Sequence, residues 1–444
     1  MSIRSAILSR VIERYLSSER LERQRARAEK ARRASGRPHV VHYFHQADDP
    51  YAHLMAQVLP HLARRFDVTI EPHLVKPPAD WAAPEREQLV AYSRRDAALL
   101  ALRAGLSFMD HGRQPDPSRV RLAEGQCAAA IREGTFVDLA ESIGTALWLD
   151  QAPPSALPAP AGTGETERAK SAGDAQREAL GHYLGATLFY EGEWYWGIDR
   201  LHYLESRLDA LGARKTGEAG VPLFAPPVSP APDARPASAG TAEQTGAALH
   251  WYLSFRSPYT AIVADRAEAL AKAYGVPLRL RFVLPMVMRN LPVPPVKSTY
   301  IIQDTAREAR RLGVSFGRVC DPVGRPTERG YAVLPFAIAE GRGLDYARAF
   351  LKAVWSQGVD AGTDSGLKRI VTDAGLDWSQ ARRHLTCDDW RGEAEANRRE
   401  MVDLGLWGVP SFRFGDTAVW GQDRLWVIES AIRRNAMPTD AAKP

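Results

Sequence analysis

Short apolar runs and amphipathic stretches alternate along the chain, and this alternation predicts an α/β protein. A run typical of a buried strand is followed by a stretch with helical spacing of its apolar residues and then by a second strand-like run. This order occurs twice. We expect strand, helix and strand at Val40–Phe44, Pro50–Arg65 and Val68–Val75, and again at Ala248–Phe255, Pro258–Tyr274 and Pro277–Leu284.

The second half continues with helical patterns and closes with a predicted hairpin and a helix. The helices are expected at Thr299–Leu312, Gly330–Ala339, Asp345–Gln357, Asp364–Ala374 and Asp388–Leu406, the hairpin at Ser411–Phe414 and Ala418–Trp420, and the last helix at Arg424–Arg434. A β-α-β start, a helical middle and a β-β-α finish form the thioredoxin-like plan with a helical insertion. The first two strands of each copy should be parallel, because a crossover helix joins them.

The two halves also share residues, not only a pattern. Val41–Phe108 aligns without a gap to Leu249–Phe316, 208 positions later, and Tyr195–Leu201 aligns to Val419–Leu425. Self-similarity at a fixed spacing indicates a tandem duplication of one domain. Differences between the copies at polar positions then indicate which copy kept its chemistry.

Low-complexity segments suggest the domain boundaries. We expect a basic amphipathic helix at 1–36, a first domain at 38–211, a Pro/Ala-rich flexible linker at 212–246 and a second domain at 247–436. Residues 152–178 are also rich in Pro, Ala and Gly, and we expect them to be a mobile connection inside copy one. Copy one would thus have lost part of the helical insertion.

The net charge of +5 is concentrated at the N-terminus. Residues 1–37 hold eleven Arg and Lys against four Glu, so the remaining chain is slightly acidic and no nucleic-acid partner is expected. The basic helix could touch anionic lipid, but charge runs are more often solvated faces, and we expect it to pack one stripe on the body. We expect no membrane span and a cytoplasmic protein. The three cysteines are far apart, which indicates neither a disulfide framework nor a structural zinc site, and no metal is expected.

Two short motifs mark a candidate site in copy two. Phe255–Tyr259 places Ser257 at the expected N-cap of a helix that begins with Pro258, so the hydroxyl lies near unpaired N–H groups and the positive end of the helix dipole. Far along the chain, Gly408–Phe412 places Pro410 at the head of a strand, where a proline is often cis. Ser257 and Pro258 alone could be only a helix start.

These residues resemble the kappa-class glutathione transferases and 2-hydroxychromene-2-carboxylate isomerases, a branch of the DsbA-like thioredoxin folds. The resemblance covers about residues 247–434, through Ser257-Pro-Tyr, Pro294-Pro-Val-Lys-Ser-Thr-Tyr300, Gly408-Val-Pro-Ser-Phe412 and Trp420-Gly-Gln-Asp-Arg-Leu425. It implies that glutathione is the cofactor and that Ser257 is the catalytic residue, whose hydroxyl favours the thiolate form of the glutathione sulfur.

The resemblance also implies roles for the residues around Ser257. Val409 and Pro410 would pair with the cysteinyl unit, Gln422 and Asp423 would hold the γ-glutamyl end, and Lys297 with Asn290 would meet the glycyl carboxylate; Tyr259 and Trp420 could line the substrate pocket. Other interpretations stay open for two of them. Asp423 could cap the last helix, and Lys297 could be a solvated loop lysine.

Copy one departs from this pattern at each place. Asp49 stands at the serine position, Gly185-Ala-Thr has no proline, and Ile198 stands where copy two has Gln422. A carboxylate beside a thiolate would repel it. We therefore expect copy one to be a scaffold, or a pseudo-partner that replaces the second subunit of the family's dimers. In the second case the chain would be a monomeric pseudo-dimer with an apolar internal interface.

Together these features predict a glutathione-dependent isomerase or transferase that acts on a small, apolar, aromatic substrate. A disulfide oxidoreductase is disfavoured, because neither Asp49 nor Ser257 is the cysteine that such chemistry needs. The alternative is a non-catalytic interaction or adaptor protein of the same fold. Affinity for glutathione discriminates between the two.

Overall fold

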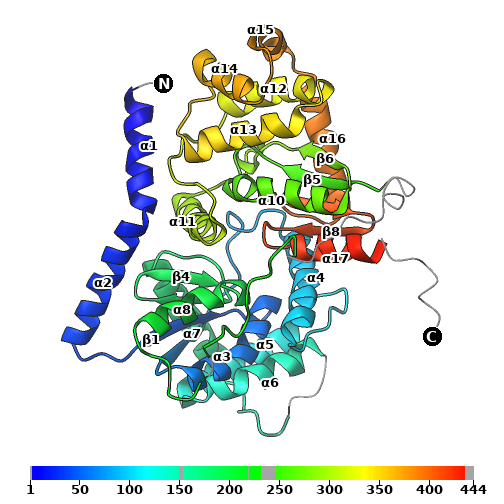
Figure 1. Ribbon diagram of the computed structural model, residues 1–444. Coiled ribbons are helices and arrows are strands. Elements are labelled where there is room, and N and C mark those ends of the chain that lie inside the picture. Colours follow the sequence, from blue (N-terminus) through cyan, green and yellow to red (C-terminus); the bar gives the residue numbers. More distant parts are fainter. Residues whose placement is uncertain (1–2, 150–153, 219, 232–246, 436–444) are drawn as a thin grey trace. The chain divides into compact units, whose positions relative to one another are not determined.

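The computed structural model describes residues 3–149, 154–218, 220–231 and 247–435. The chain divides into two compact units, which we describe one at a time (Figure 1). The N-terminal unit comprises Leu21–Pro226 and Pro294–Tyr300. The C-terminal unit comprises Met1–Arg20, Pro227–Val293 and Ile301–Pro444.

The N-terminal unit is built on a four-stranded mixed sheet in the order β2-β1-β3-β4. Strands β1 and β2 are parallel, and the other two pairings are antiparallel. Its strands are β1 (Val40–His45), β2 (Thr69–Leu74), β3 (Thr187–Tyr190) and β4 (Glu193–Trp196), and its helices are α3 (Pro50–Arg65), α4 (Arg86–Ala104), α5 (Pro117–Glu133), α6 (Phe136–Trp148), α7 (Thr163–Ala179), η1 (Ile198–Arg200) and α8 (Leu201–Ala210).

The C-terminal unit repeats this sheet in the order β6-β5-β7-β8, again with one parallel and two antiparallel pairings. Its strands are β5 (Leu249–Leu253), β6 (Leu278–Phe282), β7 (Ser411–Phe414) and β8 (Thr417–Trp420). Its helices are α10 (Pro258–Tyr274), η2 (Met286–Arg289), α11 (Pro295–Leu312), α12 (Arg325–Ala339), α13 (Gly343–Ser356), α14 (Asp364–Asp373), α15 (Trp378–Arg382), η3 (Arg383–Thr386), α16 (Trp390–Asp403) and α17 (Leu425–Asn435). The first residues of α11 belong to the N-terminal unit. The sequence repeat is therefore a repeat of the thioredoxin-like fold, as predicted.

Alternation along β1 separates the two faces of the N-terminal sheet. Val41 and Tyr43 point into the main core, which α3, α6 and α8 also line, for example through Leu54, Ile143 and Leu204. Phe44 belongs to a separate cluster on the opposite face. This is the period-two arrangement expected of a strand whose two faces meet different surroundings.

The prediction of a mobile connection over 152–178 is wrong for its second half. Residues 163–179 form α7, which packs along β2. Gly173 permits the close approach, because a Cβ atom there would overlap the backbone carbonyl of Leu74. The small residues of this segment thus serve helix–strand packing rather than flexibility.

The linker predicted at 212–246 is also shorter than expected. The backbone N–H of Asp67 donates to the Ala213 carbonyl (2.8 Å), and the N–H of Leu223 donates to the Glu205 carboxylate (3.0 Å), so the described residues up to 226 pack on the N-terminal unit. In the C-terminal unit, Ser229 donates to the Glu429 carboxylate at 2.8 Å. Residues 232–246 lie outside the described part of the chain.

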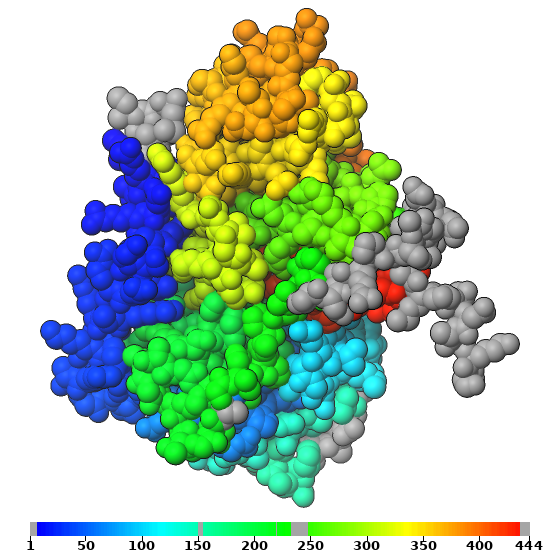
Figure 2. Space-filling model, viewed as in Figure 1, coloured from blue at the N-terminus to red at the C-terminus, as the bar shows by residue number. Residues whose placement is uncertain are grey.

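The basic head forms two helices, α1 (Ile3–Leu16) and α2 (Ser18–Ala34), instead of the single predicted helix. The apolar stripe is buried only toward the end of α1, where Ile12 and Tyr15 are half-buried and Leu16 is buried. Ile7, Leu8 and Val11 are exposed, whereas Ser9 and Leu16 are buried, and the head is visible at the surface (Figure 2). At the end of α1, Arg310 donates to the Leu16 carbonyl at 3.0 Å within the C-terminal unit.

Candidate functional site

Ser257 is the N-cap of α10, as the sequence predicts. Its backbone is extended, and its hydroxyl oxygen accepts a hydrogen bond from the Thr260 N–H at 3.2 Å. The helix begins with Pro258, whose missing N–H costs nothing at this position. The half-buried hydroxyl therefore sits at the positive end of a 17-residue helix, where a negative charge is favoured.

The second motif meets the first at this hydroxyl. The Ser257 hydroxyl donates to the carbonyl of Val409 at 3.2 Å, and the Val409–Pro410 peptide bond is cis. Pro410 directly precedes β7, which pairs with β5 at the centre of the sheet. Two motifs that are 152 positions apart in the chain thus meet at one hydroxyl.

Aromatic side chains belong to the same elements. Tyr259 lies in the first turn of α10 and donates its hydroxyl to the Asp304 carboxylate of α11 at 2.8 Å. Trp420 ends β8 and packs edge-on against Trp407, with ring centroids 5.1 Å apart. Gly408 lies so close to the Trp420 indole that a Cβ atom would be 3.1 Å from its nitrogen.

Gln422 is the centre of a buried polar group. Its amide oxygen accepts from Arg266 of α10 at 2.8 Å, and its amide nitrogen donates to Glu308 of α11 at 2.8 Å. Glu308 also accepts from Arg311 at 2.8 Å. Burial lowers the pKa of Arg266, and the neighbouring charge of Arg311 lowers it further. We call Arg266, Glu308 and Gln422 the polar triad.

Asp423 follows the triad in sequence. Its carboxylate forms an ion pair with Arg424 at 3.2 Å, and its side chain is 21% exposed. The predicted cofactor role needs a carboxylate that an ammonium group can reach, and this exposure is compatible with it.

The two residues expected at the glycyl carboxylate lie in different units. Asn290 is exposed in the C-terminal unit and ends η2 in the left-handed conformation, with a φ of 60°, which asparagine tolerates. Lys297 lies in the first turn of α11, in the part that belongs to the N-terminal unit.

Lys297 is not a solvated loop lysine. The side chain is buried, its ammonium donates to the Ala82 carbonyl at 2.9 Å, and burial lowers its pKa to about 8. Its role toward a ligand stays a prediction.

Copy one keeps the scaffold of this site and replaces its chemistry. The Tyr259–Asp304 hydrogen bond recurs as Tyr51–Asp96 at 2.8 Å. Asp49 caps α3 in place of Ser257, and burial raises the pKa of its carboxyl to about 7. Ala186, with a φ of 53°, stands in place of Pro410.

The polar triad has no polar counterpart in copy one. By the sequence alignment its three positions are Val58, Leu100 and Ile198, and all three lie in the apolar core of the N-terminal unit. The fold therefore does not require a buried polar group here. A buried polar group is seldom the most stable choice for a core, so stability of the fold alone does not explain its presence in copy two.

Arg266 and Glu308 are the residues that sequence reasoning missed. Each lies on the same helical face as a residue of the site, because Arg266 is seven positions after Tyr259 and Glu308 is four positions after Asp304. A comparison of the aligned copies position by position would have found them, since both become apolar in copy one.

Two of the three cysteines have thiols with raised pKa values. Cys320 is half-buried, and burial raises its pKa to about 11; Cys127 of the N-terminal unit is buried, with its pKa raised to about 12. Thiols with raised pKa values are poor nucleophiles at neutral pH.

Residues 248–433 match the family model of the DSBA-like thioredoxin domain. This part of the chain, which holds Ser257, Pro410 and the polar triad, is thus a DsbA-like thioredoxin domain.

Among curated proteins, the chain is similar to 2-hydroxychromene-2-carboxylate isomerases. It is 24% identical to the Pseudomonas putida enzyme over 196 residues, which are 42% of this chain and 94% of that protein. It is 25% identical to the Sphingobium xenophagum enzyme over 197 residues, or 41% of this chain and 97% of that protein. These similarities support an enzyme of the DsbA-like family, at low identity.

Two solved structures are similar to part of the chain. A 2-hydroxychromene-2-carboxylate isomerase has a TM-score of 0.38 and 23% identity, with 44% of this chain and 99% of that chain covered. The cytosolic disulfide reductase DsbM from Pseudomonas aeruginosa has a TM-score of 0.34 and 18% identity, with 42% of this chain and 99% of that chain covered.

Among the described residues, no helix is long and apolar enough to cross a membrane.

Proposed function

We propose that the C-terminal unit binds glutathione at the start of α10 and acts as a glutathione-dependent isomerase or transferase on a small, apolar, aromatic substrate. The observation that carries this proposal is the contact of the Ser257 hydroxyl with the Thr260 N–H and the Val409 carbonyl at the positive end of the helix. Hydroxyl donors and helix N-termini both lower the pKa of a thiol. Glutathione bound there would supply a thiolate that adds to a conjugated carbonyl compound, permits bond rotation and then leaves unchanged.

Ser257 would stabilise the sulfur by turning its hydroxyl hydrogen. The Thr260 N–H holds the oxygen in place, so the hydrogen can leave the Val409 carbonyl and point to a negative sulfur while the oxygen stays fixed. The freed carbonyl of Val409 could then accept from the cysteinyl N–H of the peptide. One local rearrangement would serve both groups.

The polar triad would position the γ-glutamyl end. Gln422 is held from both sides by Arg266 and Glu308, which fixes its amide orientation. A primary amide can make up to four hydrogen bonds, so it can keep both partners and still contact a ligand. Asp423 would offer its carboxylate to the ammonium group.

The similarity to isomerases supports this proposal over a non-catalytic adaptor. Because of this similarity, isomerisation should be assayed before a transfer reaction. The substrate of the relatives is the first compound to test.

Calorimetric titration of the full chain with glutathione tests the proposal. We expect one glutathione per chain. The variant Arg266→Val/Glu308→Leu/Gln422→Ile copies the residues of copy one and should stay folded, because the other unit carries the same apolar set in its core. Its affinity for glutathione should fall by at least about tenfold, which is roughly 1.4 kcal/mol.

Each other result has a distinct meaning. A chain that binds no glutathione would rule out the proposed function. Two molecules per chain would show that copy one also kept a site. Unchanged affinity in the triple variant would show that glutathione binds without help from the polar triad.

A further inference from the structure

A second group of polar side chains lies on the sheet of the N-terminal unit. His42 is on β1, and Glu71 and His73 are on the neighbouring edge strand β2. In the parallel register His42 lies opposite Glu71, and His73 lies two residues further along β2, on the same face.

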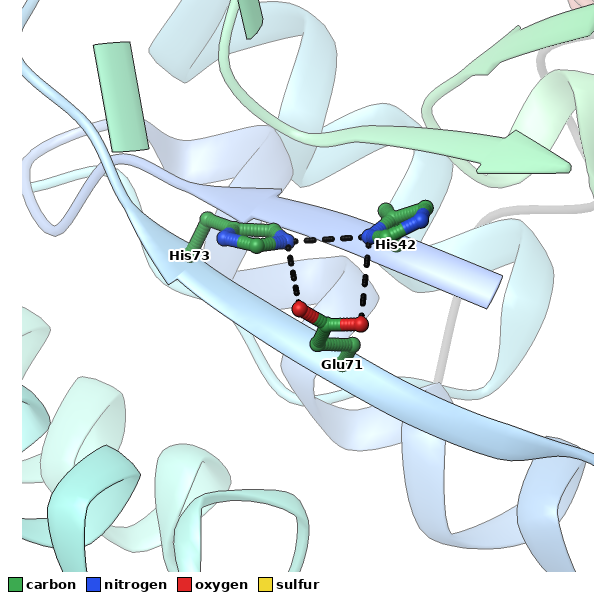
Figure 3. A group of neighbouring side chains, drawn as sticks. All are labelled: His42, Glu71 and His73. Atoms are coloured by element: carbon green, nitrogen blue, oxygen red, sulfur yellow. Dashed lines mark hydrogen bonds and ion pairs between the residues drawn. The ribbon is translucent and has the colours of Figure 1, made fainter. Parts of the chain in front are cut away.

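The three side chains converge on one point (Figure 3). Nδ1 of His42 is 3.1 Å from Nε2 of His73. One oxygen of the Glu71 carboxylate is 3.5 Å from the first nitrogen, and the other is 3.7 Å from the second. One ligand atom from each residue can be chosen so that all three lie within 4.8 Å of one another.

These separations match those of ligands around a small metal ion. Zinc binds imidazole nitrogen and carboxylate oxygen at about 2.0–2.2 Å, which places neighbouring ligands of a tetrahedron roughly 3.3–3.5 Å apart. We propose that His42, Glu71 and His73 form a binding site for zinc or a similar divalent transition-metal ion. Three protein ligands would leave the fourth position to water or another small molecule.

The packing around the histidines holds their rings in place. Phe44 stacks on His73 with ring centroids 4.8 Å apart, and Phe189 of β3 packs against His42 at 6.1 Å. The two histidine side chains are 21% and 15% exposed, whereas that of Glu71 is 52% exposed. The histidines are thus preorganised, and an ion can enter from the side of the carboxylate.

The corresponding positions in copy two exclude this site. They are His250, Arg279 and Arg281, in the same parallel register. The Arg281 guanidinium donates to Nδ1 of His250 at 3.0 Å, so a cation already occupies the place of the second histidine. The fold alone therefore does not demand the ligand set of copy one. His250 also provides a matched control.

The competing interpretation is a hydrogen bond without metal. Two neutral imidazoles at this distance can form one hydrogen bond, in which the N–H of one ring donates to the bare nitrogen of the other. Glu71 would then be a polar neighbour on an exposed strand. Metal affinity separates the two interpretations.

The test is a calorimetric titration of the chelator-treated full chain with zinc, and a parallel titration with cobalt followed by visible absorption. We expect one tight site per chain. His73→Asn and Glu71→Gln should each lower the affinity by roughly 10- to 100-fold or more, as changes in a metal's coordination environment typically do. His250→Asn should bind as the unchanged chain does.

Glu71→Gln keeps the test decisive if a histidine variant fails to fold, because Glu71 is exposed. Equal affinity in the unchanged chain and in Glu71→Gln, or no zinc binding at all, would overturn the proposal. Cobalt spectra dominated by thiolate charge-transfer bands would also overturn it, because they would assign the ion to cysteine.

Discussion

The side chain that caps the first helix of the fold differs between the two copies. Ser257 and Asp49 cap matching helices, and each accepts a backbone N–H, at 3.2 and 2.9 Å. The serine hydroxyl can also donate, whereas an ionised carboxylate only accepts and repels a thiolate. Burial raises the pKa of the Asp49 carboxyl to about 7. Copy one also has Ala186 at the position of Pro410.

The exchange Ser257→Ala should raise the pKa of the bound glutathione thiol toward its ordinary value of about 8.5 and lower turnover. Loss of the cap should reduce the free energy of unfolding by only about 1 kcal/mol. Ultraviolet absorbance of the thiolate against pH measures the first effect, and urea unfolding measures the second.

Asp49→Ala is the matched control, because it removes the equivalent cap in copy one and should leave the thiol pKa unchanged. A thiolate titration of Ser257→Ala that coincides with that of the unchanged chain would show that the hydroxyl does not act on the sulfur.

At the scale of elements, α7 packs closely on β2 through a glycine and not through large apolar side chains. The helix carries no large apolar side chain, and its buried residues are Thr166, Lys170, Gly173 and Arg177. Lys170 forms an ion pair with Glu124 of α5 at 2.8 Å, which offsets the cost of burying its charge. Backbone approach at Gly173 and this ion pair hold the helix.

We therefore expect Gly173→Ala to destabilise the N-terminal unit by about 1–3 kcal/mol, because the added methyl group must displace the backbone of β2. Gly164→Ala is the control in the first turns of the same helix, where the added atom would meet only the end of the Arg168 side chain at 3.5 Å.

The control should be neutral or stabilising by up to about 1 kcal/mol, since alanine favours helix. Urea unfolding of both variants gives the comparison. Equal stability of Gly173→Ala and Gly164→Ala would mean that α7 does not pack on the sheet as described.

At the scale of the whole molecule, one chain carries two thioredoxin-like sheets with the same strand order, and only one of them has the serine, the proline and the polar triad. A duplication that supplies both halves of a former dimer relaxes selection on one site. The pseudo-dimer remains a hypothesis about assembly.

This hypothesis predicts that the chain is a monomer of 49.0 kDa in solution. Multi-angle light scattering measures the mass directly, at several protein concentrations, because a weak dimer dissociates on dilution. A stable mass of twice this value would show that copy one does not replace a partner subunit.

The sequence by itself determined the elements whose signals are local. The bounds of α3 and α10 were predicted to the residue, because an N-cap, a proline in the first turn and apolar spacing all lie within one short stretch. The parallel pairing of the first two strands followed from the crossover helix, and the closing hairpin of copy two was predicted from its turn residues. Ser257 and Pro410 were found for the same reason, since each sits in a short motif with its own backbone requirement.

Only the tertiary structure decided which distant side chains meet. The hydrogen bonds of Gln422 with Arg266 and Glu308, the burial of Lys297 against Ala82 and the convergence of His42 with His73 all join residues far apart in sequence. The composition of α7 suggested a loop, and packing on β2 made it a helix. Spacing along one element is encoded within a few residues, whereas these contacts depend on how elements pack, which no local pattern records.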